Sequence, residues 1–232
     1  MFPIVGMNIE WIFLIAIAVV GFIVQARLQA VFGKYSKVTF AGGLTGREVA
    51  EKMLRESGIN SVKVVATRGN LTDNYNPRTR TISLSEGVYA SNSVAAAAVA
   101  AHETGHAIQH AVGYAPLKMR SALVPVISVT SKWAIWVILA GIMMTQMDGG
   151  SMTLYWIGIL MIAMSAVFAL ITLPVELNAS ARAMHWLRAD GSLNPQQLTQ
   201  ARTALNWAAR TYLVAALSAV VTLLYFLAAR RN

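Results

Sequence analysis

No cysteine occurs among the 232 residues of the chain, which excludes a disulfide framework and any metal site built on thiolates. The chain is also poor in charge, because only 12% of its residues are Asp, Glu, Lys or Arg, against about 25% in ordinary soluble domains. Hydrophobic residues make up 56% of the chain, and the mean hydropathy is +0.53. This composition indicates a membrane protein.

Four stretches of the sequence are long and apolar enough for a helix to cross a bilayer, which takes about 20 residues. They cover approximately residues 8–28, 124–147, 152–173 and 211–229. The first stretch has neither a basic segment before it nor an A-x-A-like cleavage site after it. We therefore expect a retained anchor rather than a signal peptide.

The formal net charge of +9 follows the ends of these stretches and does not indicate nucleic-acid binding. Lys and Arg residues lie after the first and third stretches and before the second and fourth, whereas the N-terminal tail has none. The positive-inside rule therefore places the N-terminus outside and both basic loops in the cytoplasm. Arg230 and Arg231 oppose this orientation, and a fourth stretch lying along the membrane surface would remove the conflict.

The hydrophilic part between the first two stretches predicts one small α+β domain. Thr45 and Glu48 have the spacing of a capping box at the start of a helix, which Gly58 ends. The elements expected after it are strands at 62–67 and 80–85, separated by turns, and a long alanine-rich helix between Ser93 and Gly113.

The expected fold is a mainly α membrane protein with about four transmembrane helices and a small α+β, zincin-like domain between the first and second. The expected parts are an anchor at 1–31, the domain at 32–121, a transmembrane hairpin at 122–173, a helical segment carrying the third ligand at 174–210, and a C-terminal transmembrane helix at 211–232.

The alanine-rich helix carries the sequence HETGH, an HExxH motif. Residues four apart share a helix face, so His102 and His106 can both bind one ion, and zinc accepts imidazole nitrogen at about 2.0–2.1 Å. Glu103 is rotated by about 100° from His102. Its carboxylate is therefore poorly placed as a ligand but well placed to act as a general base on a water. His110 lies two turns beyond His102, so it is expected either to have a structural role or to support a ligand from outside the metal site.

A catalytic zinc site with two histidines needs a third protein ligand and one open position. The motif is not extended to HExxHxxGxxH, because Gln109 and Val112 stand at the two further places. The third ligand is expected just after the third stretch. Two membrane crossings, by the second and third stretches, separate this segment from the motif, so both lie on the same side of the membrane. Glu176 is the first candidate, because a carboxylate at a membrane boundary is costly without a partner. His185 competes for this place, and Glu176 could instead pair with Arg182 or face water.

Five segments together resemble the YugP-type bacterial membrane zinc metallopeptidase family, and the resemblance covers nearly the whole chain. They are DNYNPR at 73–78, ISLS at 82–85, AAHETGHAIQH at 100–110, GYAPLKMR at 113–120 and PVELNASARA at 174–183. The resemblance implies Zn²⁺ as cofactor, His102, His106 and Glu176 as ligands, and Glu103 as general base. Ser180 stands where more distantly related enzymes often have an Asp that orients a ligand histidine.

The resemblance further implies an endopeptidase of the bacterial inner membrane. The four apolar stretches predict several crossings, and the positive-inside rule places the active site on the cytoplasmic side. Its expected partners are a peptide or membrane-protein substrate and the lipid bilayer, with no nucleic acid. The alternative is an inactive zinc-binding membrane scaffold or regulator. Peptide hydrolysis also needs a donor to the oxyanion, for which the candidates are Arg182, His185, Tyr114 and Tyr75. The strand at 80–85 could align an extended substrate as an edge strand, or it could equally be an ordinary half-buried strand.

Overall fold

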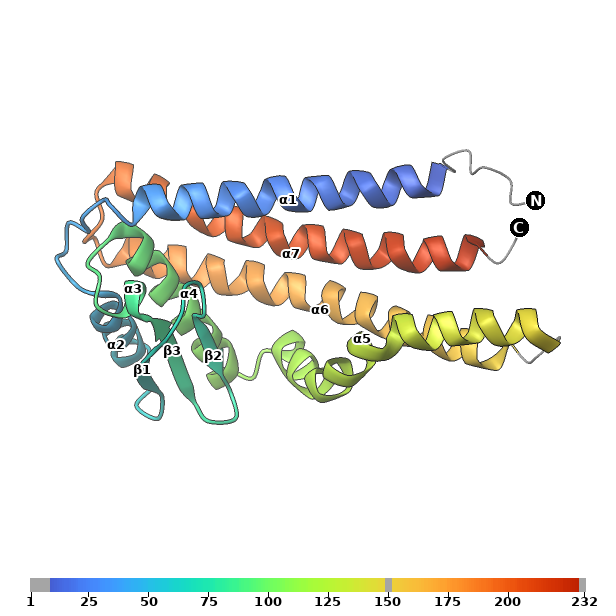
Figure 1. Cartoon of the computed structure of the whole chain (residues 1–232). Helices are drawn as coiled ribbons and strands as arrows, with labels where there is room; N and C mark the ends of the chain where they lie inside the picture. Colours follow the sequence, from blue (N-terminus) through green and yellow to red (C-terminus); the bar gives the residue numbers. More distant parts are fainter. Residues whose placement is uncertain (1–8, 149–151, 230–232) are drawn as a thin grey trace. The chain divides into compact units, whose positions relative to one another are not determined.

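The computed structural model describes residues 9–148 and 152–229, in which helices predominate (Figure 1). The helices are α1 (Ile9–Tyr35), α2 (Gly46–Glu56), α3 (Glu86–Tyr89), α4 (Val94–Ala111), α5 (Ala115–Asp148), α6 (Thr153–Ala189) and α7 (Pro195–Ala229), and the strands are β1 (Lys63–Thr67), β2 (Asn74–Asn76) and β3 (Thr81–Ser85). The N-terminal tail and Arg230–Arg231, which bear on the expected membrane orientation, lie outside the described residues.

Four helices of the described chain are long and apolar enough to cross a membrane, which confirms the predicted number. They cover Ile12–Tyr35, Ala115–Thr145, Thr153–Ala189 and Pro195–Ala228. Helices α5, α6 and α7 extend well beyond their apolar stretches, because the flanking residues include many Ala, Leu, Gln, Lys and Arg, which are good helix formers. The polar segment after the third stretch is therefore the last part of α6, a turn and the first part of α7.

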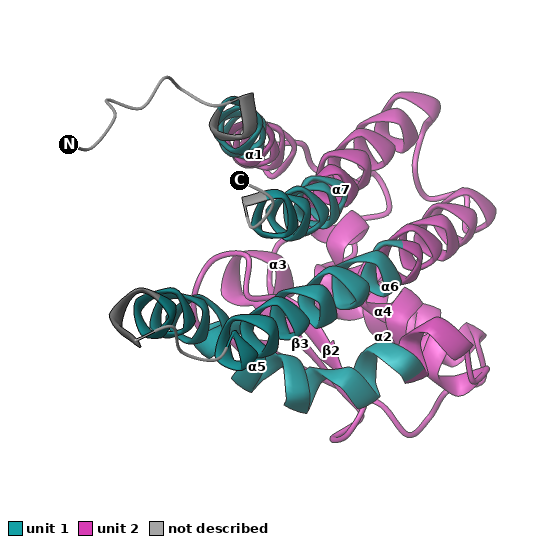
Figure 2. Cartoon of the chain, turned by 90° about the vertical axis from the view of Figure 1, so that its right-hand side faces the viewer, with its two compact units in different colours: residues 1–23, 119–173, 212–232 teal, residues 24–118, 174–211 magenta. Residues whose placement is uncertain are grey.

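The chain divides into two compact units (Figure 2). Unit 1 comprises residues 1–23, 119–173 and 212–232 and holds most of the apolar length of the four long helices. Within it, α5 and α6 approach closely where a Cβ on Gly141 would lie 2.5 Å from the backbone nitrogen of Tyr155. The Tyr155 hydroxyl also donates a hydrogen bond of 2.6 Å to the carbonyl of Phe226 in α7. These contacts join α5, α6 and α7 within unit 1.

Unit 2 comprises residues 24–118 and 174–211 and contains a three-stranded sheet in the order β1-β3-β2. Strand β1 pairs in parallel with β3, and Val64 lies opposite Ile82. Strand β2 pairs antiparallel with β3, and Tyr75 lies opposite the same Ile82. The two predicted strands are present, but the segment expected as turns contributes β2. Strand β3 is therefore the central strand, which rules out the edge-strand interpretation of this segment and agrees with the alternative of an ordinary half-buried strand.

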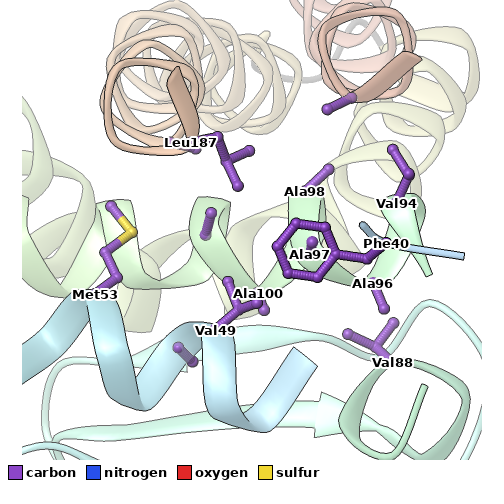
Figure 3. Close-up of a cluster of buried hydrophobic side chains, with 14 of the residues drawn as sticks. Phe40, Val49, Met53, Val88, Val94, Ala96, Ala97, Ala98, Ala100 and Leu187 are labelled. Atoms are coloured by element: carbon purple, nitrogen blue, oxygen red, sulfur yellow. The ribbon is translucent and has the colours of Figure 1, made fainter. Parts of the chain in front are cut away.

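The core of unit 2 surrounds the alanine-rich helix α4, as Figure 3 shows. The side chains of Ala97 and Ala100 are fully buried, together with Val49 and Met53 of α2 and Leu187 of α6. Alanine allows neighbouring elements to approach α4 closely from several sides without leaving cavities. Helix α2 packs against α4 and begins at the predicted capping box, in which Thr45 and Glu48 bond reciprocally.

Candidate metal centre

Helix α4 positions the two histidines of the HExxH motif. The Ser93 side chain caps the helix by accepting a hydrogen bond of 3.1 Å from the backbone N–H of Ala96. The helix ends before Gly113, whose φ of +67° favours glycine. Between these ends the helix is regular, so His102 and His106 lie one turn apart on the same face.

Helix α6 brings Glu176 to that face. A Cβ built on Gly105 would lie 2.6 Å from the carbonyl oxygen of Ala179, so the two backbones are in direct contact at this point. Glycine is required because any side chain would push against the α6 backbone. Glu176 lies three residues before Ala179 and is only 1% exposed. The close approach of the helices therefore carries a carboxylate into the interior beside the two imidazoles.

Three donor atoms converge at this place. Glu176 Oε2 lies 3.2 Å from His102 Nε2 and 3.4 Å from His106 Nε2, and the two imidazole rings are nearly perpendicular at 84°. In a tetrahedral zinc site with bonds of about 2.0–2.1 Å, neighbouring donor atoms lie about 3.3–3.4 Å apart. The two distances from the carboxylate oxygen are close to this value, and all three donor atoms lie within 4.8 Å of one another, so they could hold a divalent metal ion such as zinc.

The nitrogens of the imidazoles that face away from this group also have partners. His102 Nδ1 lies 3.0 Å from the Ser180 hydroxyl, and His106 Nδ1 lies 3.0 Å from Gln109 Oε1. Such partners orient the ring of a metal-binding histidine. Ser180, a sequence candidate for such a supporting place, contacts His102 with a hydroxyl instead of the carboxylate of the family pattern, whereas the sequence analysis did not single out Gln109 as a partner. The sequence signal for the contact of Gln109 with His106 was their spacing of three residues on one helix, because residues at this spacing are neighbours on the helix surface.

Glu103 lies next to His102 and is 8% exposed. Burial raises the pKa of its carboxyl above the ordinary value, and the carboxylates of Glu176 and Asp73 act in the same direction, against the two nearby imidazoles. A bound cation would lower this pKa again.

The electrostatic environment of His106 favours a positive charge. Burial lowers the pKa of its imidazole, but hydrogen bonding to Glu176 and the charges of Glu103 and Glu176 outweigh burial, so the pKa is raised. A proton and a metal ion compete for the same nitrogen, so metal binding at this histidine releases a proton.

The remaining site candidates from the sequence, Arg182, His185 and Tyr114, lie in different surroundings. Arg182 Nε donates a hydrogen bond of 2.9 Å to Asn178 Oδ1. The same oxygen accepts a hydrogen bond from Gln109 Nε2, so Asn178 connects Arg182 to Gln109. His185 is exposed and lies outside the group of donor atoms, so Glu176 and not His185 accompanies the two histidines. Tyr114 lies in the turn after α4, where its N–H donates to the Gln109 carbonyl.

Tyr75 and His110 form a separate pair. The Tyr75 hydroxyl lies 2.7 Å from His110 Nδ1, and this contact links the short strand β2 to the last turn of α4. Strand β2 follows Asp73, whose carboxylate accepts hydrogen bonds from the backbone N–H and the hydroxyl of Ser85. The pair thus anchors β2 to α4 and agrees with a structural role for His110.

Comparison with known proteins assigns the chain to a family. A sequence profile of the family described as "Putative neutral zinc metallopeptidase" matches residues 10–231. The chain belongs to this family. It is also 39% identical over 202 residues to the Bacillus subtilis (strain 168) protein named "Putative membrane protease YugP", and the alignment covers 87% of this chain and 88% of that protein. No solved structure matches the chain. The resemblance noted in the sequence is thereby confirmed.

Proposed function

We propose that this member of the zinc metallopeptidase family is an integral-membrane endopeptidase. The proposal is carried by the convergence of His102, His106 and Glu176 donor atoms beside the buried carboxyl of Glu103. A zinc ion held by these three ligands would have one further coordination position, as in catalytic zinc sites. The family name and the name of the Bacillus subtilis relative support zinc and proteolysis.

In this proposal each side chain has a separate role in peptide hydrolysis. When bound, zinc polarises a peptide carbonyl and makes a water molecule acidic enough to react near neutral pH. Glu103 takes the proton from that water and delivers it to the nitrogen of the departing amine. Burial of Glu103 limits exchange of this proton with bulk solvent. Arg182 and Tyr114 are the proposed hydrogen-bond donors to the oxyanion. His185 is less suited to this role because its side chain is exposed.

An extended substrate would align on β2, because β2 and not β3 is the strand at the edge of the sheet next to α4. The contact between Tyr75 of β2 and His110 of α4 holds this strand beside the helix that carries the general base. The proposed substrate is a peptide or a segment of a membrane protein in extended conformation.

The proposed location is the bacterial inner membrane, with several crossings and the metal centre on the cytoplasmic side. Four apolar helices and the name of the relative support a membrane protein. The basic residues that flank these helices in the sequence support the orientation. An inactive zinc-binding membrane scaffold is the alternative function.

The test compares the full-length protein with Glu103→Gln, both purified and loaded with zinc. We expect the variant to keep stoichiometric zinc and to lose peptide cleavage by about 10²- to 10⁴-fold, because it loses the general base but no ligand. Unchanged cleavage by Glu103→Gln would contradict the mechanism. A wild-type protein that binds stoichiometric zinc but cleaves neither peptides nor membrane proteins would favour the scaffold.

A further inference from the structure

Gln109 is buried between the two elements that supply the metal ligands. Its side chain is 0% exposed, and it lies on α4 one turn beyond His106. Its carbonyl oxygen Oε1 lies 3.0 Å from His106 Nδ1. A buried amide of this kind destabilises a protein unless each of its polar atoms has a partner.

The contacts of Gln109 fix the direction of its amide. The Nε2 atom donates to the backbone carbonyl of Val175 at 2.8 Å and to Asn178 Oδ1 at 3.0 Å. These two acceptors use both N–H groups of the amide. A flipped amide would place its carbonyl oxygen against two other oxygens and its NH₂ against His106. The observed direction, with Oε1 toward His106, is therefore strongly favoured.

This direction determines which nitrogen of His106 carries the proton. A carbonyl oxygen only accepts hydrogen bonds, so the 3.0 Å contact requires an N–H at Nδ1 of His106. In the neutral imidazole, Nε2 then carries the free electron pair. Nε2 is the atom that faces Glu176 Oε2 at 3.4 Å. His106 is thus prepared to bind a metal through this nitrogen.

The same amide also holds the second ligand-bearing helix. Val175 directly precedes Glu176, so the bond from Gln109 to the Val175 carbonyl ties the α6 backbone to α4 beside the carboxylate. Asn178 is held in turn, because its Oδ1 also accepts from Arg182 Nε at 2.9 Å. All of these residues lie within unit 2. One glutamine therefore contacts His106 and the residue next to Glu176.

The partner of His102 is chemically different. The Ser180 hydroxyl at 3.0 Å can donate or accept, so it orients the ring of His102 without selecting a tautomer. Ser180 and Gln109 are also both uncharged, whereas a carboxylate that accepts from Nδ1 of a metal-binding histidine raises the basicity of that histidine. Tautomer selection at this centre therefore rests on Gln109.

We propose that Gln109 is a positioning residue that locks His106 in the tautomer that binds zinc and ties its helix to the helix of Glu176. This inference rests on the proposed zinc site. It predicts that removal of the amide lowers zinc affinity even though every ligand is retained. The expected loss is about 10- to 100-fold, as for other residues that orient metal-binding histidines.

The experiment measures zinc affinity of the full-length protein by competition with a chelator, without reference to cleavage. Gln109→Met keeps the unbranched shape of the side chain but removes the amide. The matched control is Gln197→Met, because Gln197 is also buried but bonds to the backbone of Thr39 and Ala41, away from the metal ligands. We expect Gln109→Met to lose affinity and Gln197→Met to keep it.

Imidazole ¹⁵N NMR of the zinc-loaded protein gives a second measurement, which a purely structural role would not change. The wild type and Gln197→Met should show a slowly exchanging Nδ1–H for His106, and Gln109→Met should lose this signal. If Gln109→Met does not fold, Asn178→Ala should show a smaller affinity loss in the same direction, because it frees one N–H of the Gln109 amide.

Three results would overturn the inference. Wild-type zinc affinity in Gln109→Met, or in Asn178→Ala where that variant replaces it, would remove the positioning role and leave the proposed function intact. An equal affinity loss in Gln197→Met would show that any buried glutamine has this effect. Absence of zinc binding by the wild type would reject the proposed function together with this inference.

Discussion

Gly105 lies directly against the carbonyl of Ala179, in the middle of the HExxH motif. A Cβ at position 105 would come within 2.6 Å of the Ala179 oxygen and within 3.2 Å of two further backbone atoms of the same residue. Because these are backbone atoms, they cannot turn away as the end of a side chain could. The distance between α4 and α6, and hence the spacing of the metal ligands, depends on this glycine.

Gly105→Ala is therefore expected to force the two helices apart. We expect a loss of about 1–3 kcal/mol in the free energy of unfolding, as for overpacked sites, and weaker zinc binding. The matched control is Gly87→Ala in α3, because a Cβ at that position meets no atom within 4 Å. Thermal unfolding and zinc titration of both variants test this, and equal effects at the two positions would contradict it.

Glu176→Ala should lower zinc affinity by more than about 100-fold. This loss is larger than that expected when a residue that only hydrogen-bonds to a metal-binding histidine is removed. The reason is that the variant removes one of three donor atoms. His185→Ala is the control, because His185 competed for the same role in the sequence but is exposed in the structure. Metal analysis after dialysis against a weak chelator distinguishes them. Zinc loss in His185→Ala alone would refute the ligand assignment.

Ser180→Ala should weaken zinc binding by about 10-fold, at the low end of the range for outer partners, because the lost group is a neutral hydroxyl. Thr104→Val is a suitable control. It removes a buried hydroxyl in the same motif, but one that donates to the Ala100 carbonyl of its own helix at 2.8 Å. Calorimetric zinc titration gives both affinities, and an unchanged affinity in Ser180→Ala would show that the contact to His102 is dispensable.

Asp190 gives a prediction about stability and pH. Burial raises the pKa of its carboxyl, but hydrogen bonds from Lys52 and Ser192 outweigh burial, so the pKa is lowered. A lowered pKa in the folded state contributes stability above the unfolded value of about 3.9, and this contribution is lost as the pH falls through the folded value. Asp190→Asn should therefore be less stable at pH 7 by about 1–3 kcal/mol.

The difference between Asp190→Asn and the wild type should shrink as the pH is lowered below about 5. Denaturant unfolding at a series of pH values measures it. The control is Glu51→Gln, which removes the exposed pair of Arg47 and Glu51 and should change stability by less than about 1 kcal/mol. A constant difference at every pH would contradict the role given to the Asp190 charge.

Local patterns predicted several elements correctly. Helix α2 begins at the capping box of Thr45 and Glu48 because those two residues satisfy the first backbone N–H groups by themselves. Strand β2 was not predicted, because an Asn-Tyr-Asn segment has weak strand propensity and pairs only where β3 offers a partner. The central position of β3 follows from that pairing, which no local pattern contains.

The sequence by itself determined the long apolar helices and the two histidines one turn apart, because both depend on spacing along a single helix. Only the tertiary structure decided that Glu176, 74 residues from His102, completes the group, and that Gln109 holds His106. These contacts depend on how closely α4 and α6 pack at Gly105 and Ala179. Packing distance is a property of two helices together, so neither segment of sequence encodes it alone.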